Sequence, residues 1–345
     1  MKEALGREIA GLFPGYFALV MATGIISIAT HLLDMDMISR ILAFLNKIFF
    51  TLLWLLTLAR LVRYPHRFLA DLTSHVRGPA FFTFVAGTCV LGSQLVIIEG
   101  DYFIGEVLWG MGCFLWLVLI YTFLSAMAIR REKPGIEKGI SGTWLITVVA
   151  TQSVSVLGAL IAPSFGPDRA EILFISLALF LLGCMFYIMI ITFIFYRLVF
   201  FTLEPEAFTP PYWITMGAAA ITTLAGALLI QNVFMWTLLR ETEPFLKGFT
   251  LFFWASATWW TVLIAILDLW RYLVGRVPLR YDPLNWSMVF PLGMYTVCTF
   301  QLAKAEAIGF LLLIPRIFIY IALLAWIAAF AGLVIRIAGI FTNRT

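Results

Sequence analysis

Ten apolar stretches follow one another along the 345-residue chain, and we interpret each as a helix that spans a lipid bilayer. They alternate in texture: the first stretch of each pair is rich in small and hydroxyl-bearing residues, and the second is rich in bulky apolar ones. The first stretches are residues 12–29, 79–97, 142–161, 211–230 and 284–302, and the second are residues 48–61, 107–129, 172–200, 251–273 and 308–335. Small and polar helix faces are tolerated in a bilayer only against other helices or a wet cavity. The alternation therefore predicts five helical hairpins whose first helices surround a central pore.

The composition excludes a soluble protein. Hydrophobic residues make up 62% of the chain and charged residues only 12%, with a mean hydropathy of +1.00. Ten spans and their loops use nearly the whole sequence. We therefore expect an all-α integral membrane protein with ten transmembrane helices, in which residues 1–345 form one domain and any function lies within the membrane.

The positive charges of the loops predict the orientation. If the N-terminus lies in the cytoplasm, most of the 23 Lys and Arg residues fall in cytoplasmic segments. The cations on the other side are only Arg40, Lys47, Arg169, Arg240, Lys247, Lys304 and Arg316. We expect a multi-pass protein of the inner (plasma) membrane with both termini in the cytoplasm.

This orientation has an electrostatic consequence for the pore. All five first stretches would begin at the cytoplasmic side, where each helix N-terminus carries roughly half a positive charge. Helix N-termini attract phosphate, sulfate and carboxylate groups without a special motif, and the cytoplasmic arginines add to the same potential. A small anion is therefore the expected solute.

Neutral polar residues are the candidates for lining this pore, because residues of the five first stretches include no Asp, Glu, Lys or Arg. The candidates are Thr23, Ser27, Thr83, Thr88, Thr147, Thr151, Thr222, Ser287 and Thr296. The same stretches also hold Ser93, Gln94, Thr143, Gln152, Ser153, Ser155, Thr215, Thr223 and Thr299. Hydroxyl and amide donors can replace part of an anion's hydration without holding the ion tightly. The alternative for each residue is a hydrogen bond between helices.

Prolines are concentrated in the first stretches. Pro14, Pro79, Pro211 and Pro291 are candidates for kinks, because a proline within a helix removes one backbone hydrogen bond. Pro14 and Pro79 also fit an ordinary first-turn position.

No catalytic or cofactor site is predicted. Cys89, Cys113, Cys184 and Cys298 each stand alone in an apolar span, and the three histidines fall at span ends. We expect no metal, no cofactor and no enzymatic activity.

Four segments resemble the tellurite-resistance/C4-dicarboxylate transporter family, which includes the plant slow-type anion channels, fungal malate permeases and fungal sulfite efflux pumps. They are LFPGYFALVMATGIISIA (12–29), RYPHRFLADL (63–72), PPYWITMGAAAITTLAG (210–226) and WSMVFPLGMYT (286–296). The resemblance implies five hairpins with quasi-fivefold symmetry, kinked inner helices around a pore, and a homotrimer in which each subunit has its own pore.

The resemblance also implies a gate. A phenylalanine on the ninth span occludes the pore in this family, and Phe290, which directly precedes Pro291, matches it. An aromatic ring in a narrow tube blocks ions by dewetting the constriction. Phe84 on the third span is a weaker candidate for a second ring.

Two transport functions remain open from the sequence. The neutral lining favours a gated anion channel. The alternative is a proton-coupled carrier for C4-dicarboxylates such as malate, sulfite or tellurite, since Glu99, Asp101, Asp268 and Asp282 lie near span ends and could couple protons. A membrane enzyme lacks a constellation of catalytic side chains, and a receptor lacks an extramembrane domain.

Overall fold

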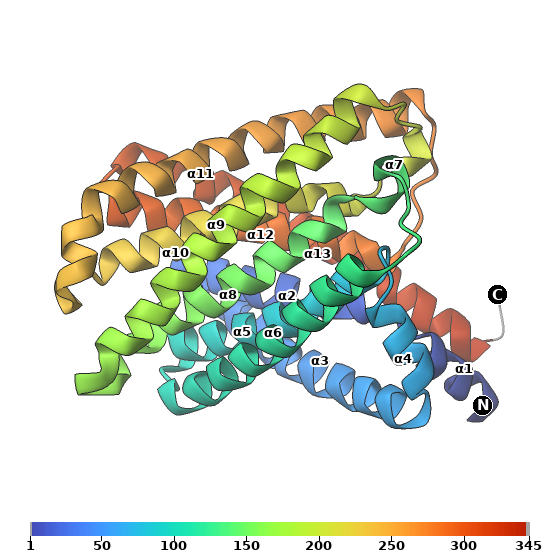
Figure 1. The fold of residues 1–345 in the computed structure, drawn as a ribbon, viewed down its shortest axis with the longest axis horizontal. Coiled ribbons are helices and arrows are strands. Elements are labelled where there is room, and N and C mark those ends of the chain that lie inside the picture. Colours follow the sequence, from blue (N-terminus) through green and yellow to red (C-terminus); the bar gives the residue numbers. More distant parts are fainter. Residues whose placement is uncertain (1, 343–345) are drawn as a thin grey trace.

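The computed structural model describes residues 2–342, and all its regular secondary structure in that range is helical (Figure 1). The ten longest helices among them are α2 (Ala18–Leu32), α3 (Asp36–Arg63), α5 (Phe82–Gln94), α6 (Tyr102–Ile129), α8 (Ile146–Ile161), α9 (Arg169–Phe200), α10 (Ile214–Gln231), α11 (Thr237–Leu269), α12 (Trp286–Ala305) and α13 (Leu313–Thr342). Three shorter helices are α1 (Lys2–Gly11), α4 (Pro65–Leu72) and α7 (Ile136–Gly139).

Eight helical stretches within residues 2–342 are long and apolar enough to cross a membrane. One of them, Gly142–Phe200, contains both α8 and α9, and the chain leaves helical geometry between them at Gly166 (φ 54°, ψ −114°). The helix α12 is not among the eight. Length and hydropathy thus support a multi-pass membrane protein, while the count of ten spans stays a prediction.

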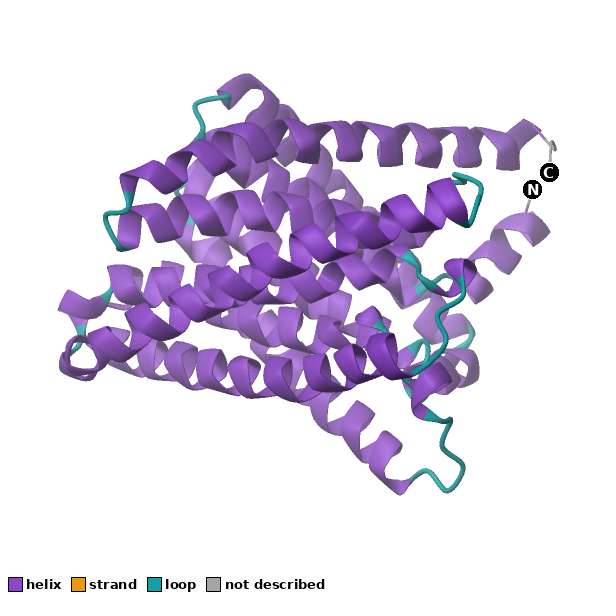
Figure 2. Ribbon diagram, turned by 90° about the horizontal axis from the view of Figure 1, so that it is seen from above, coloured by secondary structure: helices purple, strands orange, loops and turns teal. Residues whose placement is uncertain are grey.

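Five helices form a closed ring. The helix α2 packs against α5, α5 against α8, α8 against α10, α10 against α12, and α12 against α2 again. We call these five the inner helices. Each also packs against the helix that follows it along the chain, namely α3, α6, α9, α11 or α13, and we call these the outer helices. Figure 1 shows α11 along the upper edge of the molecule and α3 along the lower edge, and Figure 2 shows the bundle of helices from above.

The two textures of the sequence correspond to buried and exposed helices. We compared the most apolar 18 residues of each stretch by the share of them that is buried. This share is 100% in Pro210–Gln231 and 89% in Gly78–Glu99, both of which contain an inner helix. The corresponding value is 28% in Asp36–Arg63 and 22% in Gly309–Gly339, which contain outer helices. Small residues are therefore placed where helices meet, and bulky apolar residues where lipid can solvate them.

Short 3₁₀ turns begin the inner helices and form a second ring. They are η1 (Pro14–Phe17), η2 (Gly78–Phe81), η4 (Gly142–Leu145), η7 (Pro210–Trp213) and η10 (Pro283–Asn285), and each contacts two others in the cyclic order of the inner helices. The turns η4 and η7 approach closely, since a Cβ added at Gly142 would lie 2.0 Å from the carbonyl oxygen of Pro211. The N-terminal ends of the inner helices thus converge on one region.

The prolines occupy two kinds of position. Pro14, Pro79 and Pro211 lie in the first turns η1, η2 and η7, where a missing N–H removes no helical hydrogen bond. Pro291 lies within α12. Of the four kink candidates, Pro291 is therefore the one in a helix interior.

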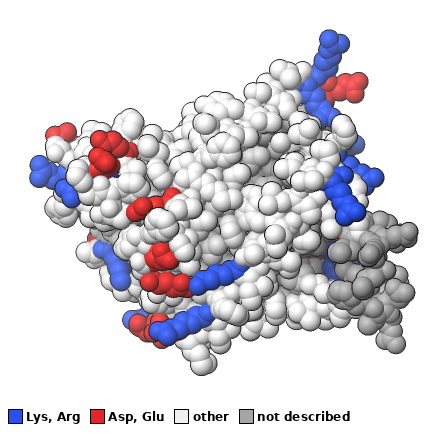
Figure 3. Space-filling model, turned by 90° about the horizontal axis from the view of Figure 1, so that it is seen from below, with Lys and Arg blue, Asp and Glu red and all other residues white. Residues whose placement is uncertain are grey.

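Charged side chains gather at two ends of the molecule, and a broad uncharged band separates them on the face seen in Figure 3. At the end that carries the N-terminus, Arg60 is only 3% exposed and contacts Asp71 of α4 at 2.5 Å. Its Nη1 also donates to the carbonyl oxygen of Leu12 at 2.8 Å, and Arg77 contacts Asp71 at 3.3 Å. This ionic cluster ties α3 and α4 to the start of the first inner helix.

Glycines allow the inner and outer helices of a pair to approach closely. A Cβ added at Gly226 of α10 would lie 2.0 Å from Thr250 Oγ1 of α11, and one added at Gly158 of α8 would lie 2.3 Å from Ser176 Oγ of α9. Small residues at such crossings are a common basis of helix packing in membranes.

We therefore expect Gly226→Ala to lower the thermal stability of the detergent-solubilised protein, since overpacking of this kind costs about 1–3 kcal/mol. The matched control is Gly248→Ala on α11, where an added Cβ has no neighbour within 4 Å. It should leave the melting temperature unchanged or raise it, because alanine favours a helix over glycine. Equal melting temperatures for the two variants would contradict the close crossing.

Candidate functional site

Three of the predicted lining residues join inner helices to outer ones. The Thr23 hydroxyl accepts a hydrogen bond from the indole N–H of Trp326 on α13 at 3.0 Å, and Thr151 accepts one from Trp116 on α6 at 2.8 Å. Ser27 donates to the carbonyl oxygen of Ser39 on α3 at 2.8 Å. These hydroxyl groups therefore face neighbouring helices.

The other hydroxyl candidates bond largely to their own helices. Thr83, Thr88, Thr147, Thr222 and Thr296 each donate to a backbone carbonyl three or four residues earlier, at distances from 2.7 to 3.0 Å. Ser287 lies near the start of α12 and is 7% exposed. In this arrangement the hydroxyl protons of the five threonines are already used, so an anion would have to displace a backbone bond to receive them.

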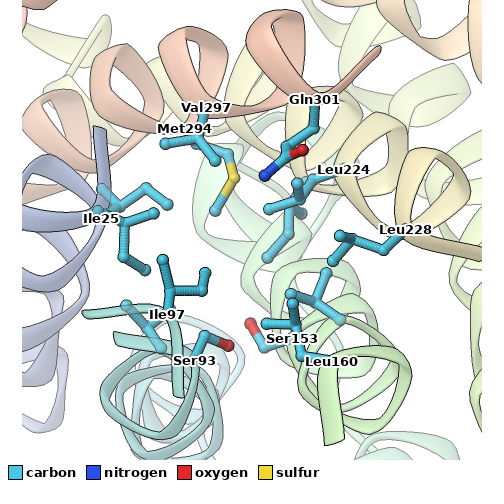
Figure 4. Close-up of a pocket in the computed structure, with 14 residues that line it drawn as sticks. Ile25, Ser93, Ile97, Ser153, Leu160, Leu224, Leu228, Met294, Val297 and Gln301 are labelled. Atoms are coloured by element: carbon cyan, nitrogen blue, oxygen red, sulfur yellow. The ribbon is translucent and has the colours of Figure 1, made fainter. Parts of the chain in front are cut away.

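A narrow cavity lies among the inner helices (Figure 4). Its volume is about 20 Å³, enough for about one water molecule. The fourteen lining residues are Ile25 and Ile28 of α2, Val90, Ser93 and Ile97 of α5 and its π-helical extension Leu95–Glu99, Ser153, Val156 and Leu160 of α8, Ile221, Leu224 and Leu228 of α10, and Met294, Val297 and Gln301 of α12. All five inner helices therefore contribute to one cavity, which is mostly apolar.

The lining residues fall into layers. On α5, α8, α10 and α12 the lining residues are three and then four residues apart, and the two lining residues of α2 are three residues apart. The first layer is Ile25, Val90, Ser153, Ile221 and Met294; the second is Ile28, Ser93, Val156, Leu224 and Val297; the third is Ile97, Leu160, Leu228 and Gln301. Each layer thus has one polar residue. The serines of the first two layers donate to Val149 and Cys89 carbonyls of their own helices, at 2.7 and 2.9 Å.

Phe290 lies on the same face of α12 as this lining. It precedes Met294 by four residues, about one helical turn toward the N-terminal end of the ring. The side chain is 2% exposed and is not among the fourteen lining residues. The next residue, Pro291, packs closely on α10, because a Cβ added at Gly217 would lie 2.7 Å from its Cγ. Phe290 is thus a large buried side chain that lies on α12 about one helical turn from the cavity, toward the N-terminal end of the helix.

Phe84 lies in an aromatic cluster between hairpins. Its ring centroid is 4.8 Å from that of Phe17, 5.4 Å from Phe81 and 5.7 Å from Trp54 on the outer helix α3. This placement gives Phe84 packing partners on both inner and outer helices, and the ring does not line the cavity.

The four acids considered for proton coupling have separate partners. Glu99 pairs with Lys47 at 2.6 Å, and Asp101 and Asp282 accept backbone N–H groups at the starts of α6 and η10. Asp268 of α11 accepts a hydrogen bond from the indole N–H of Trp213 at 2.6 Å. None of the four lines the cavity. Asp268 and Asp282 both have partners in the ring of 3₁₀ turns, Trp213 of η7 and Leu284 of η10.

Sequence reasoning missed the apolar lining and Gln301. The available signal was the recurrence of the three-and-four spacing in successive first stretches, which places one face of each helix at the same depth. The prediction relied on hydroxyl residues instead, and in a bilayer those groups also serve to join helices.

Comparisons with known proteins show which proteins this chain is similar to. A family model described as voltage-dependent anion channel (SLAC1) matches residues 12–334. An uncharacterized membrane protein of Mycobacterium tuberculosis is 36% identical over 142 residues, which are 41% of this chain and 72% of the relative. An uncharacterized transporter of Methanocaldococcus jannaschii is 27% identical over 301 residues, 84% of each chain. A sulfite efflux pump of Arthroderma benhamiae is 22% identical over 350 residues, 94% of this chain and 90% of the pump.

The match of the family model to almost the whole chain confirms the family resemblance of the sequence segments. The chain belongs to the SLAC1 family of voltage-dependent anion channels.

Proposed function

We propose that the protein is a gated anion channel whose pore runs along the axis of the five inner helices and is closed by Phe290. One observation carries the proposal: the inner helices form a closed ring around a cavity, and none of its fourteen lining residues is charged. A fixed internal charge would bind an anion tightly or repel it, whereas a neutral path lets it pass. We take the ten long helices to be ten spans with quasi-fivefold symmetry.

The ring of 3₁₀ turns supports selectivity for anions. Five helix N-termini converge there, and each contributes about half a positive charge. We place this end, together with both termini, in the cytoplasm of a cell bounded by a plasma membrane. Lys and Arg prevail at the same end of the face seen in Figure 3, as expected for cytoplasmic loops.

A proton-coupled carrier for sulfite, malate or tellurite is the second candidate, and two observations favour keeping it. Relatives of this chain include proteins named sulfite efflux pumps. Asp268 is partly buried and bonded to Trp213 of η7, so a change in its protonation could reach the ring of 3₁₀ turns. The two candidates differ in whether a proton gradient drives the anion.

The first expected outcome concerns the gate. Phe290→Ala should raise basal anion conductance several-fold in planar bilayers, because replacing the ring by a methyl group widens and wets the constriction. The matched control is Phe253→Ala, which removes an equally buried ring from the outer helix α11. Both changes are expected to destabilise the protein by about 3–5 kcal/mol, so only the conductance should separate them. Equal currents in two folded variants would contradict the gate.

The second expected outcome separates channel from carrier. For a channel, the reversal potential should follow the anion gradient and stay unchanged when a pH gradient is imposed across the membrane. A shift with pH that Asp268→Asn abolishes would instead establish proton coupling through this carboxyl group. Wild-type protein with chloride, nitrate, sulfite or malate as the permeant anion provides the comparison.

The third expected outcome concerns assembly, which we propose to be a homotrimer with one pore in each subunit. Large apolar side chains remain exposed on the outer helices, and Trp259 and Phe252 of α11 are each 52% exposed. Light scattering in detergent should give about three times the chain mass of 38.9 kDa. Concatenated trimers with a single Phe290→Ala copy should carry about one third of the fully mutant current. An all-or-none conductance would contradict separate pores.

A further inference from the structure

Two glutamine side chains meet at the end of the ring opposite the 3₁₀ turns. Gln231 is the last residue of α10, and Gln301 lies in the third layer of the cavity, on α12. Gln231 Nε2 donates to the side-chain Oε1 of Gln301 at 3.0 Å and lies 3.4 Å from the main-chain oxygen of the same residue. The pair therefore bridges α10 and α12 beside the cavity.

The contact with the main chain fixes the orientation of both amides. A backbone carbonyl oxygen can only accept a hydrogen bond, so the group of Gln231 that faces it must be the donor, Nε2. The same Nε2 approaches the Gln301 side chain, which must therefore present its acceptor, Oε1. The NH₂ group of Gln301 is left on the other side, and Figure 4 shows its nitrogen directed into the cavity. Within residues 2–342 this nitrogen has no protein acceptor.

The NH₂ group of Gln301 is the one hydrogen-bond donor that the side chains of its layer offer to an anion. The other third-layer residues, Ile97, Leu160 and Leu228, are apolar and offer no donor. The inner helices end here, and helix C-termini carry partial negative charge, which disfavours an anion. The nearest cation along α12, Lys304, lies 4.5 Å over the ring of Phe300. Burial raises the pKa of Glu306, which lies just beyond α12.

We propose that Gln301 Nε2 is the donor that coordinates the permeating anion at this end of the pore, and that Gln231 is a positioning residue that aims it. The inference rests on the proposed channel function and narrows its substrate class. One free amide donor can replace little of an ion's hydration shell, because the other lining residues are apolar or are serines bonded to their own helices. The site therefore suits small monovalent anions such as chloride and nitrate, and it disfavours sulfate and dicarboxylates, which need several donors.

The first test removes the donor. In channels opened by Phe290→Ala, the further change Gln301→Met should raise the half-saturating chloride concentration by about tenfold, as expected for the loss of a hydrogen bond to a charged group. Ser256→Ala on α11 is the control, because this serine likewise donates to a carbonyl of its own helix but does not line the cavity. It should change the value less than twofold. An unchanged half-saturating concentration in Gln301→Met would overturn the site.

The second test reverses the orientation of the Gln301 amide without replacing this residue. In Gln231→Glu the carboxylate can only accept, so it draws the NH₂ group of Gln301 away from the cavity. Phe234→Glu adds the same charge three residues away, at a side chain that is 88% exposed. Gln231→Glu should weaken chloride binding as much as Gln301→Met does, and more than Phe234→Glu does. Equal effects of the two glutamates would overturn the positioning role.

Chloride NMR line broadening with the purified proteins measures binding without transport. Wild-type protein should broaden the line, and Gln301→Met should lose most of this effect while Ser256→Ala retains it. Broadening of this pattern in a protein that carries no current, even with Phe290→Ala, would overturn the channel function and support the anion site. Equal broadening by all three proteins would overturn the site even if the channel conducts.

Discussion

The structure depends on how the hydroxyl groups of the inner helices are satisfied where no water is available. A polar group left without a partner in hydrocarbon costs several kcal/mol. Two kinds of bond prevent this. Outer-helix tryptophans donate to inner-helix hydroxyls, as Trp116 does to Thr151, Trp254 to Thr299 and Trp326 to Thr23. Other hydroxyls donate to the carbonyl of the preceding turn of their own helix. Each of these three indole bonds joins an outer helix to the following inner helix, and the bond from α13 to α2 links the last hairpin to the first.

The same bonds explain what the sequence could and could not predict. Alternation of texture predicted which helices are buried, because burial depends on side-chain size and polarity, which are read directly from the residues. It could not predict the direction of a hydroxyl group. Thr23 and Ile25 lie two residues apart, nearly opposite one another on α2, yet only the second lines the cavity. A threonine suits a wet pore and a dry helix contact equally well, and only the position of its partner distinguishes the two.

The cavity likewise has few polar groups that could bind an ion. Each layer has one polar residue, and in the first two layers its proton is bonded to the backbone. An anion inside is then stabilised mainly by the field of the helix ends and by polarisation of the apolar lining. Both are weak, which favours rapid conduction over tight binding. Such a passage requires a gate, because an uncharged pore without one would conduct continuously, and we propose that Phe290 is this gate.

In the proposed channel the two ends of α12 have different roles, since one carries the gate and the other the amide that coordinates the anion. Phe290 and Gln301 are eleven residues apart, which corresponds to roughly 16 Å along a helix. The proposed gate thus lies toward the end where helix dipoles attract the anion, and the amide lies where those dipoles repel it. An ion that has passed the proposed gate meets layers whose serine protons are bonded to the backbone until it reaches Gln301, so the amide lowers the free energy of the position farthest from the attracting charges. Since Gln301 is aimed by α10 and Phe290 adjoins the contact of Pro291 with Gly217 on the same helix, a shift between α10 and α12 would alter gate and amide together.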